Sequence, residues 1–266
     1  MKAYEIIDKE GNKSIGVLQY FEKDESYVIE LMSNLDEWTA PLLLTKYVKN
    51  KIFTIPREAS FMWVKGRVIP SNRQNISDIL TSNGLKKYDE MKLLELTSGC
   101  CAQDSMYIRR ITDLPDYVVK RVSKNLDDCV ILDDFSLLCF FKNGAVKKVL
   151  LKRLTDVDGV ARILENESLY RSGRLSAGGY AVTFNNSIDI PAGILYEAGI
   201  TIPLSTDDFK KYVQKNVLDT SECCDLLSCT RQNLAYMVSQ KQLTPIKEDV
   251  KGNLYLKGNV ISKSVE

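Results

Sequence analysis

The sequence contains no histidine among its 266 residues, and several kinds of chemistry depend on that residue. Ser-His-Asp and Cys-His nucleophilic catalysis, imidazole proton shuttling and most catalytic zinc sites require it. No Walker-type phosphate loop is present, and no G-x-G-x-x-G follows a strand-like run. We therefore expect a non-enzymatic protein that uses no cofactor and no metal ion. An enzyme that uses carboxylates of the first part of the chain stays open as an alternative, although no motif supports it.

Long apolar runs and an excess of one charge are also missing. No run approaches the roughly 20 apolar residues that a membrane span needs, and Met1–Asp8 lacks the apolar core of a signal peptide. The 36 basic and 35 acidic residues leave a net charge of +1, so no overall field favours nucleic acid or anionic lipid. The sequence predicts a cytoplasmic protein with no membrane partner.

The seven cysteines suit neither a disulfide framework nor a zinc site, because their number is odd and no C-x-x-C occurs. They stand at Cys100, Cys101, Cys129, Cys139, Cys223, Cys224 and Cys229. We expect reduced thiols that pack as small hydrophobic side chains. Redox sensing by the last three remains the alternative, because they crowd one short segment near the end of the chain.

Turn-separated apolar runs predict an antiparallel meander at the start of the chain. The strand-like runs are 3–8, 14–21 and Tyr27–Leu31. Asp8–Asn12 supplies turn chemistry between the first two. Apolar residues at helix spacing then predict helices between about Ser71 and Ser98, with Gly84 as a C-cap. We expect an N-terminal α+β domain over residues 1–125.

A second small α+β module is expected over residues 126–212. Its strand-like runs are Val130–Leu132, Leu137–Phe141, Ala145–Leu151 and Gly178–Phe184. Asn143-Gly144 predicts a hairpin, because both residues tolerate positive φ. Gly159–Tyr170 has helical spacing, and Ile188–Pro191 leads into a short helix ending at Gly199.

The segment Leu137–Val149 resembles the opening hairpin of a bacterial domain of unknown function, Leu-x-Val-x-Phe-x-Asp/Asn-Gly-x-x-x-x-Val. That family closes with Asp-(Ile/Leu) leading to Leu-Tyr, which Ile188–Ile190 and Leu195–Gly199 match in order. It usually has an acid after the second strand and a Trp before the closing Asp, where this chain has Leu150–Lys152 and Phe184. The resemblance implies a module with no established catalysis, often carried beside helix-turn-helix domains.

In the first part of the chain, Ile15–Leu18 has the form of a Val-Gly-x-Leu hairpin, and Trp63–Ile76 with Asp104 forms a second distinctive stretch. The hairpin is similar to the one that opens the leading segment of HipA-like kinases, the toxins of persistence-type toxin–antitoxin systems, and the second stretch is similar to an accessory stretch in some of them. The chain has no room for the kinase lobe and no catalytic loop. The resemblance therefore implies an antitoxin or accessory subunit, with a toxin or another protein as partner.

The last fifty residues contain two helix signals separated by a short turn. Asp219–Glu222 has the form of a capping box, and a helix Cys223–Leu227 follows. Ser228-Cys229 makes the turn, and Thr230 can cap a second helix, Arg231–Val238. This is the spacing of a helix-turn-helix, which we expect over residues 213–266.

The first turn of the second helix contains side chains of the types that recognise DNA bases, Arg231, Gln232 and Asn233. Arginine pairs bidentately with guanine, and glutamine or asparagine pairs with adenine. Two strands, Leu243–Lys247 and Leu254–Lys257, are expected to flank a basic-tipped wing.

The segment resembles the excisionase and MerR-like winged helix-turn-helix family in three elements: Thr220–Glu222, Thr230–Asn233 and Leu243–Ile246. In that family the second helix enters the major groove and the wing follows the backbone. The resemblance implies that the groove is contacted by Thr230, Arg231, Gln232, Asn233 and Tyr236. It implies that phosphates are contacted by Lys247, Lys251 and Lys257.

The local charge lowers the affinity for DNA that a single copy is expected to have. From residue 216 on, six basic residues stand against six acidic ones, whereas a strongly phosphate-bound module is usually basic. A homodimer on two half-sites of double-stranded DNA would compensate. We expect a DNA-binding regulator, an antitoxin or autoregulator of its own operon. The alternative is a protein-binding adaptor or inhibitor whose C-terminal domain is structural.

Other polar residues are expected to be structural. Arg67 and Arg73 near Trp63 are expected to support a surface, and the Asp133-Asp134 and Asp207-Asp208 pairs to serve turns and caps. Asp189 is expected to cap the helix that follows it.

Overall fold

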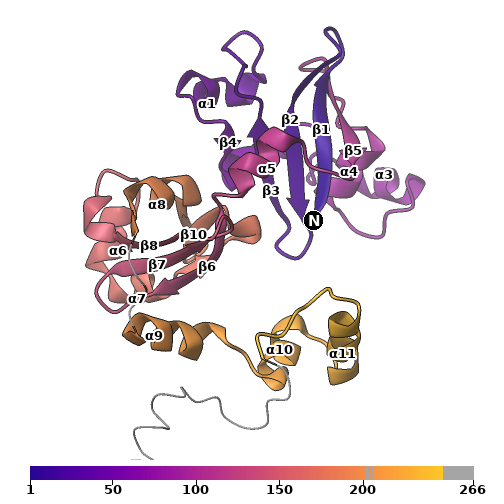
Figure 1. Cartoon of the computed structure of the whole chain (residues 1–266). Coiled ribbons are helices and arrows are strands. Elements are labelled where there is room, and N and C mark those ends of the chain that lie inside the picture. Colours follow the sequence, from indigo (N-terminus) through magenta and orange to yellow (C-terminus); the bar gives the residue numbers. More distant parts are fainter. Residues whose placement is uncertain (202–203, 205, 248–266) are drawn as a thin grey trace, which may run out of the picture. The chain divides into compact units, whose positions relative to one another are not determined.

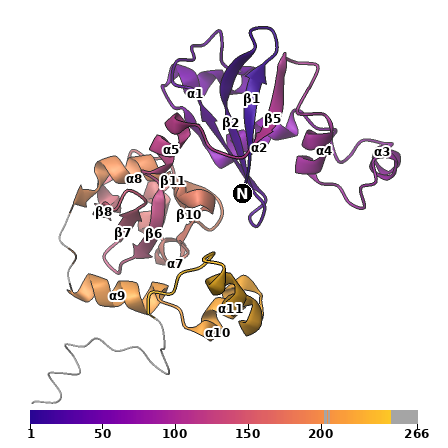
Figure 2. The same cartoon turned by 45° about the vertical axis from the view of Figure 1, so that its right-hand side comes forward.

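The computed structural model of the chain describes residues 1–201, 204 and 206–247. The chain forms two compact units, Met1–Leu204 and a second that begins at Ser205 (Figures 1 and 2). Helices and antiparallel sheets make up the first unit, so the α+β class is confirmed at that level. The boundary expected between residues 125 and 126 falls inside this unit, although the residues on either side belong to separate hydrophobic clusters.

A five-stranded antiparallel sheet with the order β4-β3-β2-β1-β5 forms the first half of unit 1. Its strands are β1 (Lys2–Asp8), β2 (Lys13–Phe21), β3 (Ser26–Leu31), β4 (Thr54–Ile55) and β5 (Met106–Ile111). The predicted meander is confirmed, because β1, β2 and β3 pair in sequence order. The two outer strands were not predicted: β4 has two residues, and β5 carries consecutive arginines.

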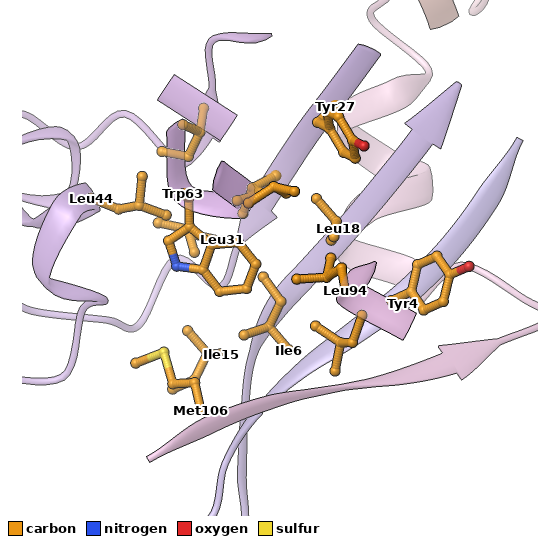
Figure 3. Close-up of a cluster of buried hydrophobic side chains, with 14 of the residues drawn as sticks. Tyr4, Ile6, Ile15, Leu18, Tyr27, Leu31, Leu44, Trp63, Leu94 and Met106 are labelled. Atoms are coloured by element: carbon orange, nitrogen blue, oxygen red, sulfur yellow. The ribbon is translucent and has the colours of Figure 1, made fainter. Parts of the chain in front are cut away.

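The helices of this half are η1 (Leu42–Leu44), α1 (Thr45–Lys49), α2 (Arg57–Lys65), α3 (Ile76–Ser82), α4 (Glu90–Leu96) and α5 (Asp116–Val122). The two helices predicted between Ser71 and Ser98 are α3 and α4, and Gly84 follows the first of them with φ +69°. Figure 1 shows α1 near the β4 edge and α3 and α4 near the β5 edge. Trp63 of α2 is 1% exposed and packs in the main cluster with Leu31 and Ile6 (Figure 3).

The second half of unit 1 contains two small antiparallel sheets. The first has the order β12-β8-β7-β6, from β6 (Leu126–Ile131), β7 (Ser136–Phe141), β8 (Val146–Leu150) and β12 (Ile200–Thr201). The second has the order β11-β10-β9, from β9 (Arg174–Leu175), β10 (Ala181–Phe184) and β11 (Ile188–Pro191). The helices are η2 (Leu151–Arg153), α6 (Val160–Glu165), α7 (Glu167–Arg171), η3 (Ala177–Gly179) and α8 (Ala192–Ala198).

The long helix predicted over Gly159–Tyr170 is two helices. Asn166 takes an extended conformation (φ −133°, ψ 101°) and its side chain accepts a hydrogen bond from the Leu169 amide. An asparagine that caps a new helix interrupts the one before it. The predicted hairpin turn at Asn143-Gly144 is present between β7 and β8, but only Gly144 has positive φ (+84°).

The two halves of unit 1 meet through polar contacts, and we call this contact region the seam. Arg57 at the start of α2 forms an ion pair with Asp189 of β11, with 2.6 Å between Nε and Oδ2. Gln19 of β2 donates a hydrogen bond to the Tyr180 hydroxyl at 2.6 Å. The expectation that Asp189 caps the following helix was wrong: α8 has no side-chain cap, and the carboxylate accepts from Arg57 and Thr183 instead.

Unit 2 contains three described helices, α9 (Thr206–Asn216), α10 (Thr220–Leu227) and α11 (Arg231–Ser239). The boundary expected between residues 212 and 213 falls inside α9. Among the residues that the structure describes, no helix has both the length and the apolar character required to cross a bilayer.

Candidate nucleic-acid interface

The start of α10 is the predicted capping box. The Asp219 carboxylate accepts hydrogen bonds from the amides of Ser221 (2.7 Å) and Glu222 (2.9 Å). Glu222 Oε2 in turn accepts from the Asp219 amide at 2.8 Å. Reciprocal capping satisfies amides that the first helical turn leaves without partners, so the residues Asp219 and Glu222 determine where this helix begins.

A tight turn joins α10 to α11. Ser228 closes α10 in the left-handed conformation (φ +51°), and Thr230 opens α11 by accepting a hydrogen bond from the Asn233 amide at 3.2 Å. The two helices pack on each other, and Leu234 of α11 is 7% exposed. The predicted order of helix, short turn and capped second helix is therefore present.

The five residues expected to contact the groove are all exposed: Thr230, Arg231, Gln232, Asn233 and Tyr236. Thr230 is the N-cap of α11, and the next three form its first turn. The Tyr236 side chain is 59% exposed, one turn beyond the other four. Arg231 Nη2 donates to Ser221 Oγ of α10 at 3.0 Å, which places the guanidinium between the two helix starts. This arrangement presents hydrogen-bonding side chains at a helix N-terminus, where free amides favour anions.

The predicted wing falls mostly outside the described residues. Lys251, Lys257 and the strand expected over Leu254–Lys257 all lie there. The strand expected over Leu243–Lys247 was wrong, because these described residues form bends and irregular backbone. Pro245 has no amide hydrogen to donate to a ladder, which weakens an isolated strand further. Lys247 is exposed.

The thiols of Cys223, Cys224 and Cys229, the candidates for redox sensing, are half-buried. Burial raises the pKa of the Cys224 thiol, and Cys229 beside it raises the pKa further. A raised thiol pKa reduces the thiolate fraction that reacts with oxidants. Cys224 is therefore a poor candidate for a redox sensor.

Several polar residues have the structural roles that we expected. Arg67 is buried, forms an ion pair with Asp104 and stacks on Trp63, with its guanidinium carbon 3.9 Å from the ring centre. Asp134 lies in the turn before β7, where it accepts from Ser136 and pairs with Lys148 at 3.1 Å. Within the described ranges, no group of three or more metal-ligating side chains comes together.

The seam was not predicted from the sequence. A cavity of about 70 Å³ lies there beside the Arg57–Asp189 ion pair, and Val28, Ile55, Tyr180 and other residues line it. The paired residues are 132 positions apart, so no local pattern could have linked them.

Comparison of the chain with protein-family models finds no match, and comparisons with curated proteins and with solved structures find none either. The function is therefore inferred from the residues themselves.

Proposed function

We propose that the protein is a DNA-binding regulator that reads double-stranded DNA with the N-terminal turn of α11. The observation that supports this most strongly is the exposed group of Thr230, Arg231, Gln232 and Asn233 at the start of a capped helix. Three of these side-chain types are those that pair with purine edges in the major groove. A helix of this kind is the element that helix-turn-helix proteins place in the groove.

The contacts around Arg231 support a reading role for that residue. Ser221 holds the guanidinium through one hydrogen bond, and both side chains are exposed. An arginine restrained by a single neutral partner loses less conformational freedom on binding than a free one. Its other N–H groups stay available for a guanine or a phosphate.

The charge balance of the C-terminal segment favours a dimer over a single copy. Six basic and six acidic residues from position 216 on give little long-range attraction to phosphates. A second copy of the chain bound to an adjacent half-site doubles the number of protein–DNA contacts, although the surface of each copy is no more basic. We therefore propose a homodimer as the species that holds DNA.

A protein-binding role is the second candidate, and exposed apolar side chains favour it. In unit 2, Leu226 is 74% exposed and Ile246 is 79% exposed, and in unit 1 Trp38 is 87% exposed. Apolar surface of this kind is typical of interaction sites. A HipA-like toxin as that partner, and an antitoxin role for this chain, rest on the resemblance of the first segment alone.

Selection of duplexes from a randomised pool tests the proposal, because the operator sequence need not be known. The intact protein is expected to enrich a related set of duplexes at low salt. Failure to enrich any sequence at low salt, for either monomer or dimer, would contradict DNA reading and favour the adaptor role.

A further inference from the structure

The cavity at the seam, which we call the seam cavity, is lined by both halves of unit 1. Its volume is about 70 Å³. Since one water molecule needs about 10–15 Å³ of such space, the cavity has room for about five to seven water-sized atoms. Most of its wall is apolar, and the apolar residues in it include Val28, Ile55, Pro56, Ala177, Ala181 and Pro191. The cavity is partly open to solvent, and both prolines are exposed.

Two alanines of the second half leave space in the wall of the seam cavity. Val182 and Phe184 of β10 belong to the hydrophobic core of that half, whereas Ala181 lines the cavity. Successive side chains of a strand point to opposite faces, so Ala181 points away from that core. Ala177 of η3 lines the same cavity. Because an alanine side chain ends at Cβ, we expect a larger side chain at either position to occupy part of the space.

The polar side chains in the wall of the seam cavity form hydrogen bonds within the protein. The contacts are Arg57 to Asp189 (2.6 Å), Thr54 to Glu30 (2.9 Å), Gln19 to Tyr180 (2.6 Å) and the Ala181 amide to Ser176 (2.8 Å). Ser26 Oγ has no partner among the described residues, but it has almost no accessible surface, so a molecule in the cavity does not reach it. The wall therefore offers few polar groups to an occupant.

This wall determines which kind of molecule suits the seam cavity. A charged molecule would lose its hydration and gain no free counter-charge, because the charges of Arg57 and Asp189 compensate each other. Water is a poor occupant, because a buried water molecule needs about two to four polar partners. Apolar cavities that lack such partners bind small apolar molecules instead. The volume and the wall together favour a small, uncharged and mainly apolar molecule.

We propose that the seam cavity is a binding site for a small uncharged molecule that is mainly apolar and has about five to seven non-hydrogen atoms. Such a molecule contacts residues of both halves of unit 1 at once. Because it binds the folded protein and not the unfolded chain, it raises the stability of unit 1 by mass action. Binding at this site does not depend on DNA binding by unit 2.

Three probes with the same number of non-hydrogen atoms test the class of ligand in the intact chain. Cyclopentanol is uncharged and mainly apolar, cyclopentylammonium has the same ring with a charge, and glycerol is uncharged and polar. Cyclopentanol is expected to shift the methyl signals of Val28 and Ala181 in a ¹H–¹³C spectrum saturably, with a Kd that is roughly millimolar for a ligand of this size. Cyclopentylammonium and glycerol are expected to bind at least about tenfold more weakly.

Matched variants show whether cyclopentanol binds in the seam cavity itself. Ala177→Met fills part of the cavity with a flexible side chain and is expected to abolish the saturable shift of Val28. Ala161→Met makes the same change at an exposed position of α6 that does not line the cavity, and it is expected to bind cyclopentanol as the wild type does. Ala181→Ile is a second filling variant, used if Ala177→Met does not fold.

Three results would overturn the proposal and leave ordered water as the occupant of the seam cavity. The first is the absence of a saturable shift of the Val28 and Ala181 methyl signals with cyclopentanol. The second is equal binding of cyclopentanol and either of the other two probes. The third is a shift of the Val28 signal that persists unchanged in a folded variant whose cavity is filled.

Discussion

Arg57 and Asp189 form an ion pair across the seam of unit 1, with 2.6 Å between Arg57 Nε and Asp189 Oδ2. Arg57 Nη2 also donates to the Asn186 carbonyl at 2.6 Å, so one side chain connects the start of α2 to the β10–β11 turn and to β11 itself. The two side chains are 28% and 23% exposed. A partly buried charged hydrogen bond of this kind stabilises more than a surface ion pair does.

We expect Arg57→Ala to lower the free energy of unfolding by about 1–2 kcal/mol, measured by urea denaturation. Arg171→Ala is the matched control. Its guanidinium pairs with Glu167 on the same helix, both side chains are more than half exposed, and a loss of at most about 0.5 kcal/mol is expected. Equal losses of unfolding free energy in the two variants would mean that the Arg57–Asp189 pair stabilises the protein no more than a surface ion pair does.

Gly179 lies where no side chain fits. It has φ +72°, and a Cβ on it would stand 1.8 Å from the Leu126 carbonyl oxygen. Gly84 also has positive φ (+69°), but a Cβ there meets no atom within 4 Å. We expect Gly84→Ala to cost only backbone strain, about 1 kcal/mol, and Gly179→Ala to cost at least about 3 kcal/mol or to prevent folding. Thermal denaturation compares them, and a Gly179→Ala protein as stable as Gly84→Ala would contradict the close approach.

Glu30 is a buried carboxylate that should give a measurable pH dependence. Its side chain is fully buried and accepts hydrogen bonds from Arg121 (3.0 Å) and Thr54 (2.9 Å). Burial raises the pKa of Glu30 above its ordinary value of 4.5, although Arg121 and Thr54 oppose the rise. The folded state therefore holds the proton more tightly than the unfolded chain does. The stability contributed by this group is present below pH 4.5 and is lost as the pH rises through the folded pKa.

Comparison of the wild type with Glu30→Gln isolates this effect. The free energy of unfolding of the wild type, minus that of the variant, is expected to fall as the pH is raised from about 4 towards neutrality. A difference that rises over the same range would show that the Arg121 ion pair outweighs burial and that the pKa of Glu30 is lowered in the folded protein.

The capping box of α10 gives a prediction for unit 2. Asp219→Ala removes the acceptor of two backbone amides and is expected to cost about 1 kcal/mol, with faster proteolysis of unit 2. Asp225→Ala is the matched control, because Asp225 is an exposed acid on the same helix whose side chain is not the N-cap of α10. This variant is expected to leave proteolysis of unit 2 unchanged.

Local signals in the sequence predicted what local chemistry determines. The β1–β3 meander, helices α3 and α4, and the capped helices α10 and α11 all follow from spacing, turns and caps within a few residues. The exposed Thr230–Asn233 group follows from the same capping logic, because Thr230 determines which residues form the first turn.

The features that the sequence did not predict depend on contacts between residues far apart in the chain. Strand β4 has two residues and exists because it pairs with β3, and β5 pairs with β1 across about a hundred positions. Asp189 has the local pattern of a helix cap. Its carboxylate instead accepts a hydrogen bond from Arg57, which lies in a distant part of the chain. Arg67 and Trp63 lie four residues apart, yet their unpartnered N–H groups depend on packing that no local pattern predicts.

The central claim is that Arg231 reads DNA, and fluorescence anisotropy with a duplex enriched by the wild-type protein tests it most directly. Arg231→Ala is expected to weaken binding to that duplex by about 1–3 kcal/mol, or roughly 5- to 150-fold. Arg73→Ala removes the same charge from an exposed site on unit 1 and is expected to bind as the wild type does. Equal affinities for the wild type and Arg231→Ala would contradict the claim.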